Sequence, residues 1–221
     1  MIKLDYESIK KFTADSKLSD KDKSKLDQIN SILRDNPSNL DILAEKGFLL
    51  FQAHLDAEAI KTFELILKLN HKYIMAYVWL AELLLFHWAD AQQAEIVLNE
   101  ALKIESNRSD LYYLLANVFR VNEEEEKYKY YLKKALEYEP DWINPRICLV
   151  EILIKEKKFE LANEEIQKLK KYLTNANLIS PKNEMQAYYE TLITGRIISP
   201  YMKNSLSKMM KIIENSLSKN I

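Results

Sequence analysis

Glycine is almost absent from this sequence of 221 residues, in which Gly47 and Gly195 are the only two. A β-rich fold needs more turn glycine than that, and two isolated glycines cannot make a glycine-rich phosphate-binding loop. Leu, Lys, Glu, Ala and Ile fill most of the chain, and most of these residues favour helices. The composition therefore predicts an all-α protein.

Cysteine and an excess of one charge are also lacking. Cys148 is the only cysteine, so it has no partner for an internal disulfide, and we expect a reducing compartment. The 32 basic and 33 acidic residues nearly cancel, which argues against a protein that mainly neutralises phosphate. No apolar run approaches the ~18 to 20 residues that span a bilayer, and the charged start lacks the core of a secretory signal. We therefore expect a cytoplasmic protein that binds neither nucleic acid nor membrane.

What the sequence does contain is a recurring spacing. Mostly small residues recur at steps of 35, 34 and 34, at Ala59, Ala94, Tyr128 and Ala162. Apolar residues follow four positions later, at Phe63, Leu98, Leu132 and Ile166. Compact residues also precede each pair, at Gly47, Ala81, Ala116 and Val150. A period of this length is typical of a solenoid of helical hairpins, because one hairpin cannot bury its own apolar face and must stack on its neighbours.

One hairpin carries an insertion. Twelve residues separate Gly47 from Ala59, whereas thirteen separate Ala81 from Ala94. We therefore expect one extra residue in the turn of the second hairpin, around residues 86–90. Pro37 should stop the preceding helix three residues before a first helix begins at Leu40. Pro140 should do the same before a first helix that begins at Ile143.

Several key positions resemble the tetratricopeptide repeat (TPR) family over about residues 37–176. They are Gly47 with Ala59 and Phe63, Ala116 with Ala135 and Pro140, and Phe159 with Ala162. Tyr128 and Arg146 depart from the family pattern, which has a small and a large apolar residue at these places. The resemblance implies a right-handed α-solenoid of stacked helix-turn-helix repeats. We expect an N-terminal cap or degenerate repeat in residues 1–36, four repeats in 37–176, and C-terminal capping helices in 177–221.

The resemblance also implies that the first helices line the inner, concave face. Their non-packing sides form one stripe per helix and are more apolar than an exposed surface requires. The stripe supplies the predicted partner-binding residues Ala44, Phe48, Phe51, Met75, Val78, Glu82, Leu85, Tyr113, Asn117, Arg120, Ile147, Glu151 and Ile154. A helix that is apolar on both sides behaves like a buried helix, so something should cover it. Three alternatives stay open: tight winding of the superhelix, a segment of a partner, or the C-terminal helix within residues 200–219.

The predicted function is a non-enzymatic scaffold that holds an apolar peptide or helix of another protein in this groove. Lysines and asparagines that would grip an acidic C-terminus, as in family members that bind heat-shock chaperones, are missing from the matching positions. The groove is closer in character to that of bacterial secretion chaperones, which suggests a chaperone-like role. Self-association, with the groove covered by the chain's own C-terminal helix, is the alternative.

The remaining candidates for chemistry are few. We expect His54 and His87 in neighbouring turns about 10 Å apart, with no carboxylate beside them, and hence no metal site. Cys148 has no histidine near it to act as a base, so we expect no catalytic thiol and no cofactor. Phe86 and Trp88 in the inserted turn either fold back onto the following helix or stand out as an anchor for a partner.

Overall fold

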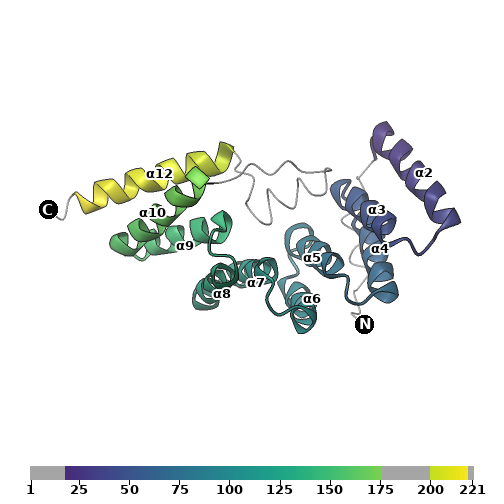
Figure 1. Cartoon of the computed structure of the whole chain (residues 1–221), viewed down its shortest axis with the longest axis horizontal. Coiled ribbons are helices and arrows are strands. Elements are labelled where there is room, and N and C mark those ends of the chain that lie inside the picture. Colours follow the sequence, from purple (N-terminus) through teal and green to yellow (C-terminus); the bar gives the residue numbers. More distant parts are fainter. Residues whose placement is uncertain (1–17, 176–199, 219–221) are drawn as a thin grey trace. The chain divides into compact units, whose positions relative to one another are not determined.

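The structure, a computed structural model, describes residues 18–175 and 200–218 (Figure 1). Within these ranges the regular elements are all helical. The chain divides into two compact units, residues 1–106 and 107–221. Parts of the predicted caps, residues 1–17 and 176–199, lie outside the described residues. None of the described helices is long and apolar enough to cross a membrane.

Unit 1 is a stack of hairpins. Helix α2 (Asp20–Asp35) packs on α3 (Leu40–Gln52), and α3 pairs with α4 (Asp56–Leu69). Helix α4 contacts α5 (Ile74–Glu82), which continues into a π-helical turn, η1 (Leu83–His87), and pairs with α6 (Ala91–Ile104). Side-chain caps start three of these helices, because Ser19, Asn39 and Asp90 accept hydrogen bonds from backbone N–H groups of the first turn.

Unit 2 continues the same pattern. Helix α7 (Ser109–Val121) pairs with α8 (Glu125–Tyr138), and α9 (Ile143–Lys155) pairs with α10 (Phe159–Asn175). Helix α12 (Pro200–Leu217) packs on α10 and α9. Its Met209 and Ile213 join Leu149, Val150 and Ile166 in one buried cluster. The C-terminal helix is therefore part of the core of unit 2.

The repeat positions pack as the spacing predicted. The compact and apolar sets that define the period are all buried, and the first helices begin at Leu40 and Ile143 as expected. Each hairpin turn holds one residue in the left-handed region, at His54, Ala89, Glu123 and Lys157. These four positions are again 35, 34 and 34 residues apart, so the turns keep the register of the helices.

The extra residue of the second hairpin is absorbed by η1. In the first hairpin the N–H of Leu55 bonds to the carbonyl of Leu50, five residues back, whereas in the second the N–H of Asp90 bonds to Leu84, six residues back. The insertion therefore widens the end of the first helix into a π turn before the chain reverses.

Two departures from the family pattern are compatible with the fold. Arg146 is buried on α9, where it bonds to the carboxylate of Glu165 and to the carbonyl of Pro140. Tyr128 of α8 is also buried. A charged side chain with partners and a large aromatic one thus replace the expected apolar and small residues.

Candidate functional site

The predicted binding stripe is buried in unit 1. Phe48 and Phe51 are only 4% and 3% exposed, and their rings lie 5.0 and 5.9 Å from the ring of Trp79 on α5. Ala44, Val78, Glu82 and Leu85 are buried as well, and Met75 is half-buried. Here the neighbouring hairpin covers the stripe, because its Trp79 packs against the two phenylalanines. Their role in partner binding stays a prediction.

The stripe is more accessible in unit 2. Arg120 and Glu151 are exposed, and Tyr113 is half-buried with its ring 5.0 Å from that of Trp142. Asn117 is buried and holds Arg120 in place, since its side-chain oxygen accepts a 3.2 Å hydrogen bond from the guanidinium Nε. Unit 2 therefore presents two charged members of the predicted set on its surface.

The end of the stripe in unit 2 is partly buried. Ile147 and Ile154 are half-buried and pack against a cluster to which α9, α10 and α12 all contribute. Cover of these two residues by the chain's own C-terminal helix, one of the three alternatives, stays a prediction.

A hollow lies beside Arg120 and Glu151, and we call it the α7–α9 hollow. It encloses about 530 Å³ and is lined by Phe119, Arg120, Glu123, Glu125, Tyr128, Cys148, Glu151, Ile152 and Lys155. Its apolar wall comes from the end of α7 and from α9, and its rim carries charges of both signs. Of these residues, the sequence analysis predicted only Arg120 and Glu151 as partner-binding, because it followed only the outward stripe of each first helix.

Burial shifts the pKa values of groups in this hollow. Partial burial raises the pKa of the Glu151 carboxyl, and the nearby Arg120 guanidinium opposes that shift. Burial of the Cys148 thiol raises its pKa, although hydrogen bonds with Tyr128 and Tyr113 act in the opposite direction. A raised thiol pKa keeps Cys148 protonated at neutral pH, which does not suit a nucleophile.

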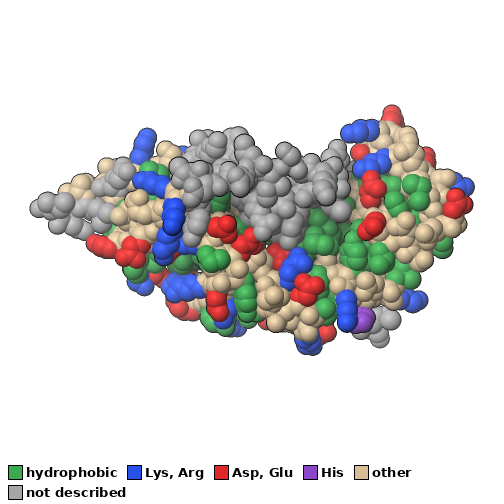
Figure 2. All heavy atoms as spheres, in the orientation of Figure 1, with side chains coloured by type: hydrophobic (Ala, Val, Ile, Leu, Met, Phe, Trp, Pro, Cys, Tyr) green, Lys and Arg blue, Asp and Glu red, His purple; other side chains and the backbone are tan. Residues whose placement is uncertain are grey.

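A second hollow lies in unit 1, between α4, α5 and α6. It encloses about 670 Å³ and is lined by Lys61, Glu64, Leu65, Leu67, Lys68, His71, Tyr77, Leu80, Ile96 and Glu100. Leu65 of α4 and Ile96 of α6 are exposed. Figure 2 shows further hydrophobic side chains on the surface of unit 1, over α3 and α4. The sequence analysis did not identify this hollow, since it considered second helices only for their packing faces.

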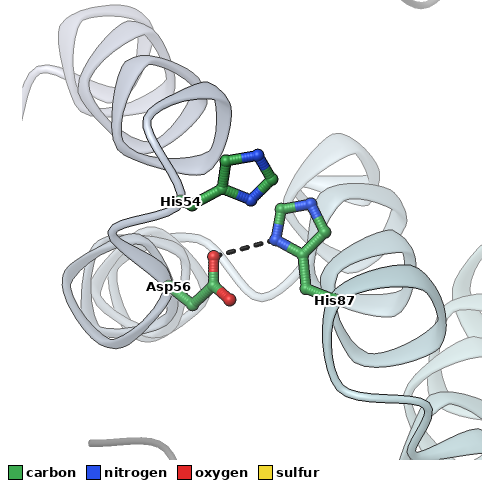
Figure 3. A group of neighbouring side chains, drawn as sticks. All are labelled: His54, Asp56 and His87. Atoms are coloured by element: carbon green, nitrogen blue, oxygen red, sulfur yellow. Dashed lines mark hydrogen bonds and ion pairs between the residues drawn. The ribbon is translucent and has the colours of Figure 1, made fainter. Parts of the chain in front are cut away.

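The two turn histidines are much closer together than we predicted. The rings of His54 and His87 lie 4.7 Å apart rather than about 10 Å, and a carboxylate does lie beside them (Figure 3). His87 Nδ1 is 2.8 Å from Asp56 Oδ1, and Trp88 Nε1 donates a 2.9 Å hydrogen bond to Asp56 Oδ2. Trp88 therefore bonds to the first residue of α4 and does not stand out as an anchor, whereas Phe86 is exposed.

Comparisons with known proteins identify the fold. No family model and no curated protein matches the sequence. Among solved structures, MamA from Desulfovibrio magneticus RS-1 is similar over 78% of this chain and 95% of its own, with 20% identity and a TM-score of 0.58. A thermophilic TPR protein of Thermus thermophilus matches over 86% of this chain and 90% of its own, with 18% identity and a TM-score of 0.59.

YrrB, described as a TPR protein with an unusual peptide-binding site, matches over 85% of this chain and 91% of its own, with 16% identity and a TM-score of 0.54. These likenesses confirm the predicted all-α, TPR-like architecture of helix-turn-helix repeats. At identities of this size they concern the fold alone.

Proposed function

We propose that this chain, which has the fold of TPR proteins, is a protein-interaction scaffold that holds a segment of another protein in the α7–α9 hollow. The observation that carries the proposal is the meeting of an apolar wall with the exposed charges of Arg120 and Glu151, two residues expected to contact a partner. The buried stripe of unit 1 offers no comparable access.

The hollow has the size and chemistry of a site for one or two side chains of a peptide. Its volume of about 530 Å³ falls within the ~300 to 1,000 Å³ of ligand pockets. An apolar side chain placed against Phe119 and Ile152 would gain ~1.5 to 3 kcal/mol from burial. Arg120 and Glu151 would bind the carbonyl and amide groups of the same segment, and hydrogen bonds to charged groups contribute ~1.5 to 3 kcal/mol each.

The proposed role is non-enzymatic. The thiol in the hollow is kept protonated by burial, and a solenoid surface suits the holding of an extended segment. A chaperone-like use follows if the bound segment is apolar, because the hollow would shield it from water. YrrB lends support by analogy only, since its description names a peptide-binding site on the same fold.

A displayed random-peptide library, selected on the full chain, tests the proposal. We expect enriched peptides to carry an apolar residue and to lose at least about tenfold in affinity for Arg120→Glu and for Glu151→Arg, because the first change places an acceptor against a carbonyl group and the second places a donor against an amide N–H. Both residues are exposed, so both variants should fold.

Lys133→Glu is the matched control, since Lys133 is an exposed residue of α8 that does not line the hollow. Peptides that bind the two hollow variants as tightly as the original chain would refute the site. Light scattering of each variant separates a loss of peptide binding from a change in self-association.

A further inference from the structure

Three side chains that the proposed function does not use meet at the hairpin turns of unit 1 (Figure 3). His54 lies in the turn between α3 and α4, Asp56 opens α4, and His87 ends η1. Each offers one atom able to bind a metal, and these atoms all lie within 4.8 Å of one another. In the figure, His54 and Asp56 lie on the same side of the His87 ring.

Two of the three are held firmly in place. Asp56 is only 4% exposed, and its Oδ2 accepts the hydrogen bond from Trp88, which leaves Oδ1 directed at His87. The His87 ring is stacked on Phe51 with 4.7 Å between centroids. His54 is exposed, and its backbone is in the left-handed region at φ 55°. A buried carboxylate and a fixed imidazole thus lie next to an imidazole that is able to rotate.

We propose that His54, Asp56 and His87 bind one divalent transition-metal ion of the zinc class. Two imidazole nitrogens and a carboxylate oxygen suit Zn²⁺, Co²⁺, Ni²⁺ or Cu²⁺, whereas Mg²⁺ and Ca²⁺ prefer all-oxygen sites. The ion takes the place of the hydrogen bond between His87 Nδ1 and Asp56 Oδ1, and His87 binds it through Nδ1 as the neutral tautomer that carries its proton on Nε2. Three protein ligands leave a fourth position for water or for a group of a partner.

The distances are compatible with such a site after one side-chain movement. Ligand atoms around a tetrahedral Zn²⁺ at ~2.0 to 2.1 Å lie about 3.3 Å from one another. The Asp56 and His87 atoms are already 2.8 Å apart, so the main adjustment is a rotation of the exposed His54 ring. A hydrogen-bonded network without metal explains Asp56, His87 and Trp88, but it leaves His54 with a ring contact to His87 alone and no use for its nitrogens.

The ion would fasten η1 to the turn between α3 and α4. Because it binds the assembled site and not the unfolded chain, it should raise the thermal stability of unit 1. Its affinity should fall in acid, because protons compete for the imidazole ligands. The second imidazole comes from the end of η1, the turn that absorbs the one-residue insertion.

The test is a calorimetric titration of the full chain with Zn²⁺ at neutral pH, after removal of any purification tag and treatment with a chelator. We expect one equivalent bound at micromolar concentration. His54→Ala should weaken binding by more than about tenfold, because even outer-shell partners of a metal ligand contribute 10- to 100-fold. His54 is exposed, so this variant should fold normally.

His71→Ala is the control, since His71 is also an exposed turn residue of unit 1 but lies outside the cluster. It should bind one equivalent with unchanged affinity. Zn²⁺ should raise the midpoint of thermal unfolding for the original chain and for His71→Ala, but not for His54→Ala. No binding to the original chain at micromolar concentration, or equal binding after His54→Ala, overturns the proposal.

Discussion

Gly47 and Phe63 fit each other at the crossing of α3 and α4. A Cβ atom placed on Gly47 would lie 2.5 Å from Cε1 and 2.9 Å from Cδ1 of Phe63, and the Phe63 ring is completely buried. The equivalent crossings pair Ala81 with Leu98 and Ala116 with Leu132. The first hairpin thus combines a smaller residue with a larger one, and its glycine is required by packing rather than by a backbone angle.

Gly47→Ala should therefore destabilise the protein despite the better helix propensity of alanine. Overpacking costs ~1 to 3 kcal/mol against a gain of ~1 kcal/mol from propensity, so we expect a net loss of about 1 kcal/mol in urea unfolding. Adding Phe63→Leu recreates the alanine–leucine pair of the second and third hairpins. The double variant should lose at least about 1 kcal/mol less than the sum of the single variants, and simple additivity would contradict the packing argument.

At the residue scale, the sequence predicted these packing positions but not the histidine cluster. Small and large residues repeat with the period, so Gly47 and Phe63 could be assigned to a helix crossing from spacing alone. The separation of His54 and His87 depended on an assumed helix spacing, and Asp56 was overlooked although it stands two residues after His54. That short His-x-Asp sequence was the available signal.

At the scale of elements, the form of the insertion could not be predicted. Counting residues placed one extra residue near 86–90, but an extra residue can lengthen a loop or widen a helix. The structure widens the helix into η1, which ends at His87. A spacing rule that treats all hairpins alike cannot anticipate which of the two occurs.

Glu156, which follows α9, joins that helix to α8 through an ion pair with Lys129. Hydrogen bonds from Lys129 and Lys158 lower the pKa of the Glu156 carboxyl from its ordinary value of 4.5 to about 2. A carboxyl whose pKa is lower in the folded chain stabilises that chain above the ordinary pKa, and this contribution is lost as the pH falls toward 2. The pair therefore stabilises the junction of α8 and α9 at neutral pH.

Glu156→Gln should flatten the pH dependence of the unfolding free energy between about pH 5 and pH 2. Urea unfolding at a series of pH values measures this dependence of the unfolding free energy on pH. Lys129→Met should flatten the same window, because it removes the largest cause of the shift. If the unfolding free energy of Glu156→Gln changed with pH as steeply as that of the original chain, the Glu156 carboxyl would have the same pKa in the folded and unfolded states, and the prediction would be wrong.

On the scale of the whole molecule, the hairpins were predictable and the accessible face was not. The period, the compact positions and the two prolines predicted the order of the helices and where they start. These features could be used because they determine packing within one hairpin or between neighbouring hairpins. Access to the inner stripe depends on what else packs there. Trp79 covers Phe48 and Phe51. Helix α12 joins the cluster against which Ile147 and Ile154 pack. Neither contact recurs with the period of the repeat, so the spacing of residues could not predict it.

Helix α12 provides the last prediction, because two adjacent isoleucines differ sharply in burial. Ile213 is 2% exposed within the cluster formed with α9 and α10, whereas Ile212 is 46% exposed. Ile213→Ala should cost ~2 to 4 kcal/mol, because it removes buried methyl groups and leaves a cavity. Ile212→Ala should change the free energy of unfolding by no more than about 0.5 kcal/mol, as surface substitutions usually do.

Urea unfolding of the two α12 variants gives both values, and hydrogen exchange should become faster in α9 and α10 only for Ile213→Ala. Equal effects of the two substitutions would mean that α12 does not belong to the core of unit 2.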